Sequence, residues 1–206
     1  MDNIDFIKDY LSDSIAVKQL ILDDKELLEG ISKISDLVIS VFRRGNKFMI
    51  AGNGGSAADS QHIAAEFVSR FYFDRPGLSA IALTTDTSML TAIGNDYGFE
   101  NLFSRQIEAH GREGDIFIGI STSGNSKNVL KAVEAAKEMG VITVALCGTK
   151  GDLSGVCDYS LPVPSSSTPH IQEAHICIGH MICAIVEEKM LNKNLMLKKC
   201  VFLLIQ

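Results

Sequence analysis

The sequence predicts a doubly wound α/β fold: a five-stranded parallel sheet with flanking helices, arranged as a flavodoxin-like three-layer sandwich with extra N-terminal helices. The first observation is a set of short apolar runs of strand length, at residues 47–51, 79–83, 115–120, 141–147 and 159–163. The second is that each of the first four runs is followed by small polar residues and then by a helical pattern. Such alternation requires crossover connections, which give a parallel sheet covered on both faces.

The chain begins with two predicted helices. Residues 3–45 carry apolar side chains at helical intervals, with a break near Glu29-Gly30. We expect residues 1–192 to form a single domain in which these helices are an N-terminal extension. For the tail, residues 193–206, a packed strand or helix and an unstructured extension both stay open, because chain ends are ordered only when they are tied down.

The first strand ends in a glycine-rich turn at residues 52–57, GNGGSA. In doubly wound folds, ligands bind outside the carboxyl ends of the strands. The turn matches the permissive G-x-G-x-x-A dinucleotide fingerprint, with Asp86 placed as a ribose-binding acid. A purely structural turn explains the same residues, so both interpretations stay open.

The helix that follows this turn carries a polar stripe. Asp59, His62, Glu66 and Arg70 follow the i, i+3/i+4 rule and therefore share one predicted face. His62 and Glu66 could bind one ligand together from this face. A solvated helix surface produces the same pattern, so the residues alone do not decide between the two.

The loop after the third strand, residues 121–126 (STSGNS), gathers four hydroxyl side chains beside a predicted helix N-terminus. Helix N-termini bind anions, and hydroxyl donors complete a cage without adding charge. The pattern therefore favours a phosphomonoester. The alternative is that Ser126 is a simple N-cap in an exposed turn.

The last predicted helix covers about residues 169–190, with Thr168 as its N-cap and Pro169 at its first position. It is apolar on nearly every side, so we expect an oligomer that buries it. Gln172 and His180 lie about 80° apart around this helix and about 12 Å apart along it. A histidine in apolar surroundings is either hydrogen-bonded core or a group placed for proton transfer.

Composition excludes several classes of function. The 206 residues are 46% hydrophobic, enough for one domain with a core, and the net charge of −6 offers no footprint for nucleic acid. Residues 1–14, MDNIDFIKDYLSDS, show neither the basic n-region nor the apolar h-region of a signal peptide, so we expect no export. The apolar run 201–205 is too short to cross a membrane. The five cysteines form neither a C-x-x-C pair nor an even set, so we expect free thiols and a cytoplasmic protein.

Four segments together resemble the phosphoheptose isomerases, the sedoheptulose 7-phosphate isomerase branch of the sugar isomerase (SIS) fold. The segments are GNGGSAADSQHIAAEF at 52–67, TTDTSMLTAIGNDYGFE at 84–100, ISTSGNSKNVLKAVEAAKEMG at 120–140 and TPHIQEAHICIGH at 168–180. The resemblance extends over about residues 30–190. It implies a homotetramer that interconverts sedoheptulose 7-phosphate and D-glycero-D-manno-heptose 7-phosphate. That reaction is the first step toward activated heptose for cell-surface polysaccharide, such as lipopolysaccharide or capsule.

The resemblance also implies roles for particular residues. The acid/base pair falls on Glu66 and His180, and the serine loop would hold the 7-phosphate. The implied substrate contacts are Asn53, Gly54, Gly55, Ser56, Glu66, Asn95, Asp96, Ser121, Thr122, Ser123, Ser126 and Gln172. One zinc ion per subunit would be held by His62, Glu66, Gln172 and His180, and no nucleotide cofactor is expected. A zinc-bound carboxylate is a weaker base, so Glu66 as base and Glu66 as ligand stay open.

The sequence departs from the family at one position before the glutamine, where His170 replaces the usual arginine. Two other classes of function are weighed against the isomerase. A non-catalytic SIS-fold module, related to replication initiator-associating proteins, would bind sugar phosphate or a protein partner; the complete set of four candidate ligands favours the enzyme. A dinucleotide-dependent oxidoreductase would need a nicotinamide partner, and nothing later in the chain supports one.

Overall fold

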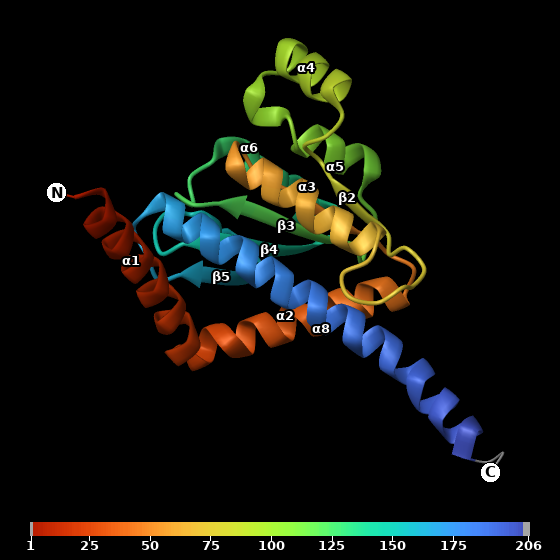
Figure 1. The fold of residues 1–206 in the computed structure, drawn as a ribbon. Coiled ribbons are helices and arrows are strands. Elements are labelled where there is room, and N and C mark those ends of the chain that lie inside the picture. Colours follow the sequence, from red (N-terminus) through yellow and green to blue (C-terminus); the bar gives the residue numbers. More distant parts are fainter. Residues whose placement is uncertain (1, 204–206) are drawn as a thin grey trace.

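A computed structural model describes residues 2–203, with side chains described through residue 190. Its centre is a five-stranded sheet in the order β2-β1-β3-β4-β5, with every neighbouring pair parallel (Figure 1). The strands are Phe48–Ala51 (β1), Ala80–Ala82 (β2), Ile116–Ser121 (β3), Ile142–Gly148 (β4) and Tyr159–Val163 (β5). The predicted doubly wound fold is confirmed, and each predicted strand matches an observed one to within a residue at either end.

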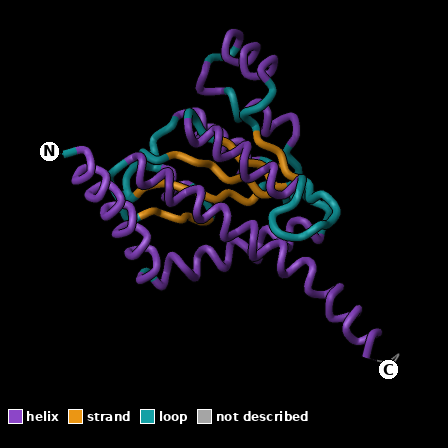
Figure 2. Tube along the Cα trace, viewed as in Figure 1, coloured by secondary structure: helices purple, strands orange, loops and turns teal. Residues whose placement is uncertain are grey.

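Helices cover both faces of the sheet, as the tube drawing shows (Figure 2). They are α1 (Asn3–Asp23), α2 (Lys25–Arg43), α3 (Gly55–Val68), α4 (Thr87–Asp96), α5 (Ser104–His110), α6 (Lys127–Glu138), α7 (Leu153–Val156) and α8 (Thr168–Leu203), with a 3-10 turn η1 (Phe99–Asn101). Helices α2, α3 and α8 pack on one face, and α5 and α6 pack on the other. The result is the predicted three-layer sandwich.

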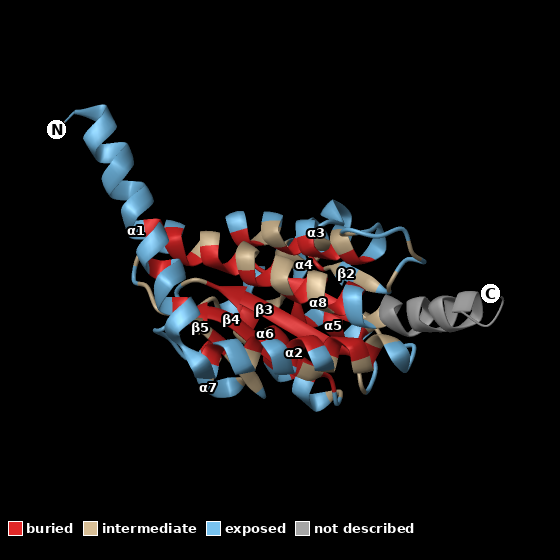
Figure 3. Ribbon diagram, turned by 60° about the horizontal axis from the view of Figure 1, so that its bottom comes forward, coloured by how far each residue is buried: buried red, intermediate tan, exposed pale blue. Residues whose placement is uncertain are grey.

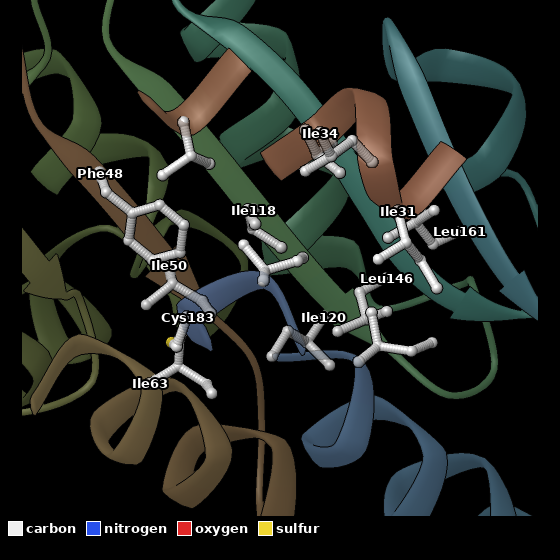
Figure 4. Close-up of a cluster of buried hydrophobic side chains, with 14 of the residues drawn as sticks. Ile31, Ile34, Phe48, Ile50, Ile63, Ile118, Ile120, Leu146, Leu161 and Cys183 are labelled. Carbon is white, nitrogen blue, oxygen red and sulfur yellow. The ribbon is translucent and has the colours of Figure 1, made fainter. Parts of the chain in front are cut away.

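The core is divided in two by the sheet because side chains along a strand alternate between its faces. Phe48 and Ile50 of β1 point into the cluster beneath α2, α3 and α8, whereas Met49 and Ala51 point into the opposite cluster. Figure 4 shows the first cluster, in which Ile63 of α3 and Cys183 of α8 meet the strand side chains. Both helices are therefore anchored to the same part of the sheet.

Two predicted helix boundaries are wrong. The first two helices are separated at Asp24, not near Glu29-Gly30. Asp24 caps α2 by accepting a hydrogen bond from the Leu27 N–H at 2.9 Å, and Gly30 lies inside α2 against Leu161 of β5. The last helix begins at Thr168 and continues to Leu203, well beyond residue 190, so most of the tail's backbone is helical. The end of the tail, residues 204–206, lies outside the described residues.

Helix α1 leaves most of its surface uncovered in one chain (Figure 3). Its buried residues are Ser14, Val17 and Ile21, toward its C-terminal half. Large apolar side chains, including Ile7 and Leu11, are more than half exposed. Among the described residues, no helix is both long and apolar enough to cross a membrane.

Candidate active site

The candidate site lies at the carboxyl end of the sheet, where β1 and β3 are neighbours. Their crossover helices, α3 and α6, leave toward opposite faces, which makes this the position where doubly wound folds bind ligands. Asn53 after β1 and Asn128 at the start of α6 hold the two loops together through reciprocal amide hydrogen bonds of 2.9 and 2.8 Å. The glycine turn and the serine loop therefore form one surface.

Three predicted site residues converge beside this surface. His62 Nε2 lies 2.8 Å from His180 Nε2 and 3.3 Å from Glu66 Oε1. One ligand atom from each of the three residues falls within 4.8 Å of the others. His62 and Glu66 are one turn apart on α3, whereas His180 comes from α8, more than a hundred residues later in the chain. The i, i+4 pair of α3 therefore faces a third candidate residue, which comes from α8.

Close packing of α3 on α8 makes this convergence possible. Gly179, the neighbour of His180, lies directly against Ile63, so that a Cβ at that position would be 2.5 Å from Ile63 Cδ1. A larger residue at position 179 would therefore require the Ile63 side chain or the helices themselves to shift. The His180 ring is also held from the side by Phe71, whose ring centroid lies 5.6 Å away.

Gln172 reaches the same neighbourhood from the first turns of α8. A Cβ on Gly55 would be 1.8 Å from Gln172 Nε2, so the amide lies directly over the glycine turn. It also faces the carboxyl group of Asp59, a member of the polar stripe that was not predicted as a site residue. Burial raises the pKa of Asp59, and Gln172, His62 and His180 partly offset that effect. One oxygen of Asp59 is buried without a hydrogen-bond partner.

The serine loop presents its hydroxyls as a group. Ser121 Oγ lies 2.9 Å from Ser126 Oγ and 3.4 Å from Ser123 Oγ. Ser126 is the N-cap residue of α6, as the alternative expects, but its side chain makes no cap hydrogen bond to the helix. Thr122 and Ser123 also line a cleft of about 280 Å³.

The far side of that cleft was missed from the sequence. It is formed by residues of two later loops and of the start of α8: Thr149, Lys150, Ser165, Ser166, Thr168 and Ile171. These positions follow β4 and β5; the carboxyl-end rule points to the loop after β4, but none of its residues was named as a site residue. Lys150 lies beside the hydroxyl loop, with its backbone carbonyl against Gly124, and its positive charge would favour an anionic group there.

Other predicted residues do not join the cluster within one chain. Asn95 and Asp96 are exposed on α4, which Figure 1 shows extending away from the sheet, and Asn95 donates a hydrogen bond to Asp96. Arg70 is not on the stripe, because α3 ends at Val68. Asp86 accepts a hydrogen bond from the Met89 N–H at 2.8 Å and caps α4, which gives it a structural explanation.

His170 lies between α8 and the N-terminal helix α1. The side chain is buried and its ring lies 4.6 Å from the ring of Tyr10 in α1. Its Nδ1 is 3.8 Å from a carboxylate oxygen of Glu173, which also accepts hydrogen bonds from Tyr10 and Ser14. His170 therefore joins α8 to the N-terminal helix and does not reach the His62 cluster.

Comparison with known proteins identifies the family of the chain. Residues 9–148 match the family model of the SIS domain. The chain is 63% identical over 185 residues to a phosphoheptose isomerase of Aneurinibacillus thermoaerophilus, covering 89% of this chain and 93% of that protein. It is 59% identical to phosphoheptose isomerase 2 of Campylobacter jejuni, covering 97% and 100%.

A solved structure shows the same fold over nearly the whole chain. The phosphoheptose isomerase of Neisseria gonorrhoeae superposes with a TM-score of 0.85 at 42% identity, covering 91% of this chain and all of that one. Sequence, fold and the arrangement of His62, Glu66 and His180 lead to one conclusion. This chain belongs to the phosphoheptose isomerase family of SIS-domain proteins.

Proposed function

We propose that this protein interconverts sedoheptulose 7-phosphate and D-glycero-D-manno-heptose 7-phosphate, the first step toward activated heptose. The observation that carries the proposal is the meeting of the Glu66 carboxylate and the His180 imidazole, from two helices, with ligand atoms within 4.8 Å. Moving a carbonyl between C1 and C2 requires one group for a carbon-bound proton and another for an oxygen-bound proton. These two side chains supply that combination.

The phosphate end of the substrate is assigned to the serine loop. Hydroxyls of Ser121, Ser123 and Ser126 surround the start of α6, whose N–H groups and dipole favour an anion. Lys150 and Thr168 on the far side of the cleft add a cation and a hydroxyl. Anchoring the ester there leaves the carbonyl end of the sugar free to reach the cluster.

In the direction from ketose to aldose, Glu66 removes a proton from C1 and an enediolate forms. His180 carries the hydroxyl proton from O1 to O2, and the protonated Glu66 returns a proton to C2. No atom is gained or lost, as an isomerisation requires. The Gln172 amide stabilises the negative oxygen of the enediolate by donating a hydrogen bond.

The cluster also fits a zinc ion. Two imidazole nitrogens and one carboxylate oxygen are ligands that zinc prefers, and they already converge from two helices. We propose that His62, Glu66 and His180 hold the metal, with the Gln172 amide oxygen as a weaker fourth ligand, and that Glu66 and His180 move protons when the metal is absent or displaced. When bound, zinc would polarise the substrate oxygens as a Lewis acid.

We also propose a cytoplasmic homotetramer. The exposed apolar side chains of α1, such as Ile7 and Leu11, support an oligomer because isolated chains rarely expose such a stripe. The described cysteines, Cys147, Cys157, Cys177 and Cys183, are free, as expected for a reducing compartment.

Turnover of sedoheptulose 7-phosphate tests the proposed reaction. The purified protein is incubated with the ketose, once after chelation and once with added zinc, and the aldose 7-phosphate is measured. We expect aldose in at least one of the two preparations. Absence of turnover in both rejects the isomerase and favours the non-catalytic SIS module, which a sugar-phosphate binding assay would then detect.

A further inference from the structure

The segment between α3 and β2, residues 69–79, is folded over a buried ion pair; we call it the return loop. Arg75 Nε lies 2.8 Å from Glu187 Oε1, and the two side chains are only 3% and 1% exposed. Glu187, on α8, also accepts hydrogen bonds from three consecutive N–H groups, those of Phe71, Tyr72 and Phe73. One carboxylate of α8 thus fixes the course of the return loop.

The same pair reaches both halves of the proposed acid/base site. Arg75 Nη2 donates to the carbonyl oxygen of Glu66 at 2.8 Å, and Nη1 donates to that of Phe67 at 2.7 Å. These carbonyls belong to the last turn of α3, where no helical partner remains. On the other side, Phe71 is held by the hydrogen bond that its N–H donates to Glu187, and the ring of Phe71 packs on His180. Glu187 lies two turns beyond His180 on α8.

Stability alone is a poor explanation for this arrangement. Removing two charges from water costs several kcal/mol per ion, and well-packed apolar residues often replace a buried pair without loss. Burial raises the pKa of Glu187, but its hydrogen bonds from the return loop and Arg75 outweigh burial and lower it, so the carboxylate stays charged. The planar guanidinium group of Arg75 and the two carboxylate oxygens of Glu187 instead fix the directions of the hydrogen bonds that they make.

We propose that Arg75 and Glu187 are positioning residues that set the separation and orientation of Glu66 and His180. The proposal rests on the proposed isomerase function. Neither residue touches the substrate; each acts through a helix end or through Phe71. The serine loop connects β3 to α6, away from the return loop. Loss of the ion pair between Arg75 and Glu187 should therefore impair proton transfer without weakening phosphate binding.

The kinetic test compares Glu187→Gln and Arg75→Lys with a matched control, Asp115→Asn. Asp115 forms an ion pair with Lys47, with side chains 1% and 22% exposed, at the opposite, amino end of the sheet. We expect both test variants to lower kcat by about 10- to 100-fold with KM changed less than about threefold, because small misplacements of catalytic groups are costly. The control should have a lower melting temperature than the wild type and the same kcat.

A double variant, Arg75→Met/Glu187→Leu, keeps the test decisive if single charges prevent folding. It removes both charges together, and such replacement usually preserves the fold. We expect a melting temperature near that of the wild type and a lowered kcat. A folded double variant with wild-type kcat would overturn the proposal, as would a loss of kcat no larger than that of the control.

A spectroscopic readout separates this proposal from the proposed reaction. Because the ring of Phe71 lies 5.6 Å from that of His180, a change in its position should shift the NMR signal of the His180 Cε1 proton, which can be followed in protein with labelled histidines. The signal should move in Glu187→Gln and stay in place in Asp115→Asn, without substrate or metal. If the wild type has no isomerase activity but this signal moves, only the proposed reaction fails. If the signal does not move, the positioning role fails.

Discussion

At the scale of single residues, we expect buried His175 to make the stability of the fold depend on pH. Its side chain is 1% exposed, and burial lowers its pKa from 6.5 to about 4. In the unfolded chain it titrates near its ordinary value, so below pH 6.5 the unfolded state binds more protons than the folded state. The free energy of unfolding should therefore fall as the pH drops from 6.5 to 4, by up to about 3 kcal/mol from this residue.

Urea unfolding at pH 7 and pH 4.5, for the wild type and for His175→Phe, measures this contribution. The variant removes the titrating group, so its loss of stability between the two pH values should be smaller than that of the wild type. Equal losses in the two proteins would show that His175 is not held neutral. His110→Gln is the matched control and should behave as the wild type does.

Single residues also show what the sequence could and could not predict about the site. The spacing of His62 and Glu66 placed them on one helix face, because helical periodicity is a local property. The partner of that face is not local: the distance of 2.8 Å between His62 and His180 depends on how α3 packs on α8. Asp59 and Lys150 were missed as site residues for the same reason, since their importance comes from what folds over them.

At the scale of elements, the contact between the start of α3 and the start of α8 should control the site. Gly55→Ala would place a Cβ 1.8 Å from Gln172 Nε2, so the amide must move away. We expect kcat to fall by about tenfold or more, because removing one stabilising donor costs at least that much. The measurement is kcat and KM with sedoheptulose 7-phosphate.

Gly155→Ala is the control for this substitution. It adds the same methyl group in α7, where nothing lies within 4 Å of the new atom. Its kcat should equal that of the wild type. Unchanged kcat in Gly55→Ala would mean that the position of Gln172 does not matter for the reaction.

The order of the elements was predictable, whereas some of their ends were not. Short apolar runs separated by helical patterns leave few alternatives to a parallel sheet, and this prediction was confirmed. The predicted break between the first two helices, near Gly30, is wrong because α2 begins at an aspartate cap, Asp24. Asp24 satisfies a free N–H of α2, and that bond, not the flexibility of Gly30, decides where the helix begins.

At the scale of the whole molecule, the stripe of Ile4, Ile7, Leu11 and Ile15 on α1 should bury itself between chains. Each of these side chains is more than half exposed in one chain. Placing charges there, as in Ile7→Glu/Leu11→Glu, should dissociate the assembly because an unpaired charge cannot be buried without a large cost. Size-exclusion chromatography with light scattering should give a tetramer of the 22.4 kDa chain for the wild type and smaller species for the variant.

Asp13→Lys is the control, since Asp13 is exposed on the side of α1 opposite the stripe. It should remain tetrameric. A monomeric wild type, or a double variant that stays tetrameric, would contradict the assignment of this face. The sequence predicted an oligomer from the apolar α8, but the exposed stripe of α1 became evident only when the fold showed that little of that helix is covered.

The central claim is that Glu66 and His180 act together on one anchored substrate. Its most direct test is kcat and KM for sedoheptulose 7-phosphate with Glu66→Gln, His180→Gln and the double variant. We predict that each single variant lowers kcat by about 10²- to 10⁴-fold, with little change in KM. The kcat of the double variant should be only slightly lower than that of the less active single variant. The effects of substituting residues that act as a unit are not additive. A single variant that keeps wild-type kcat would contradict the account.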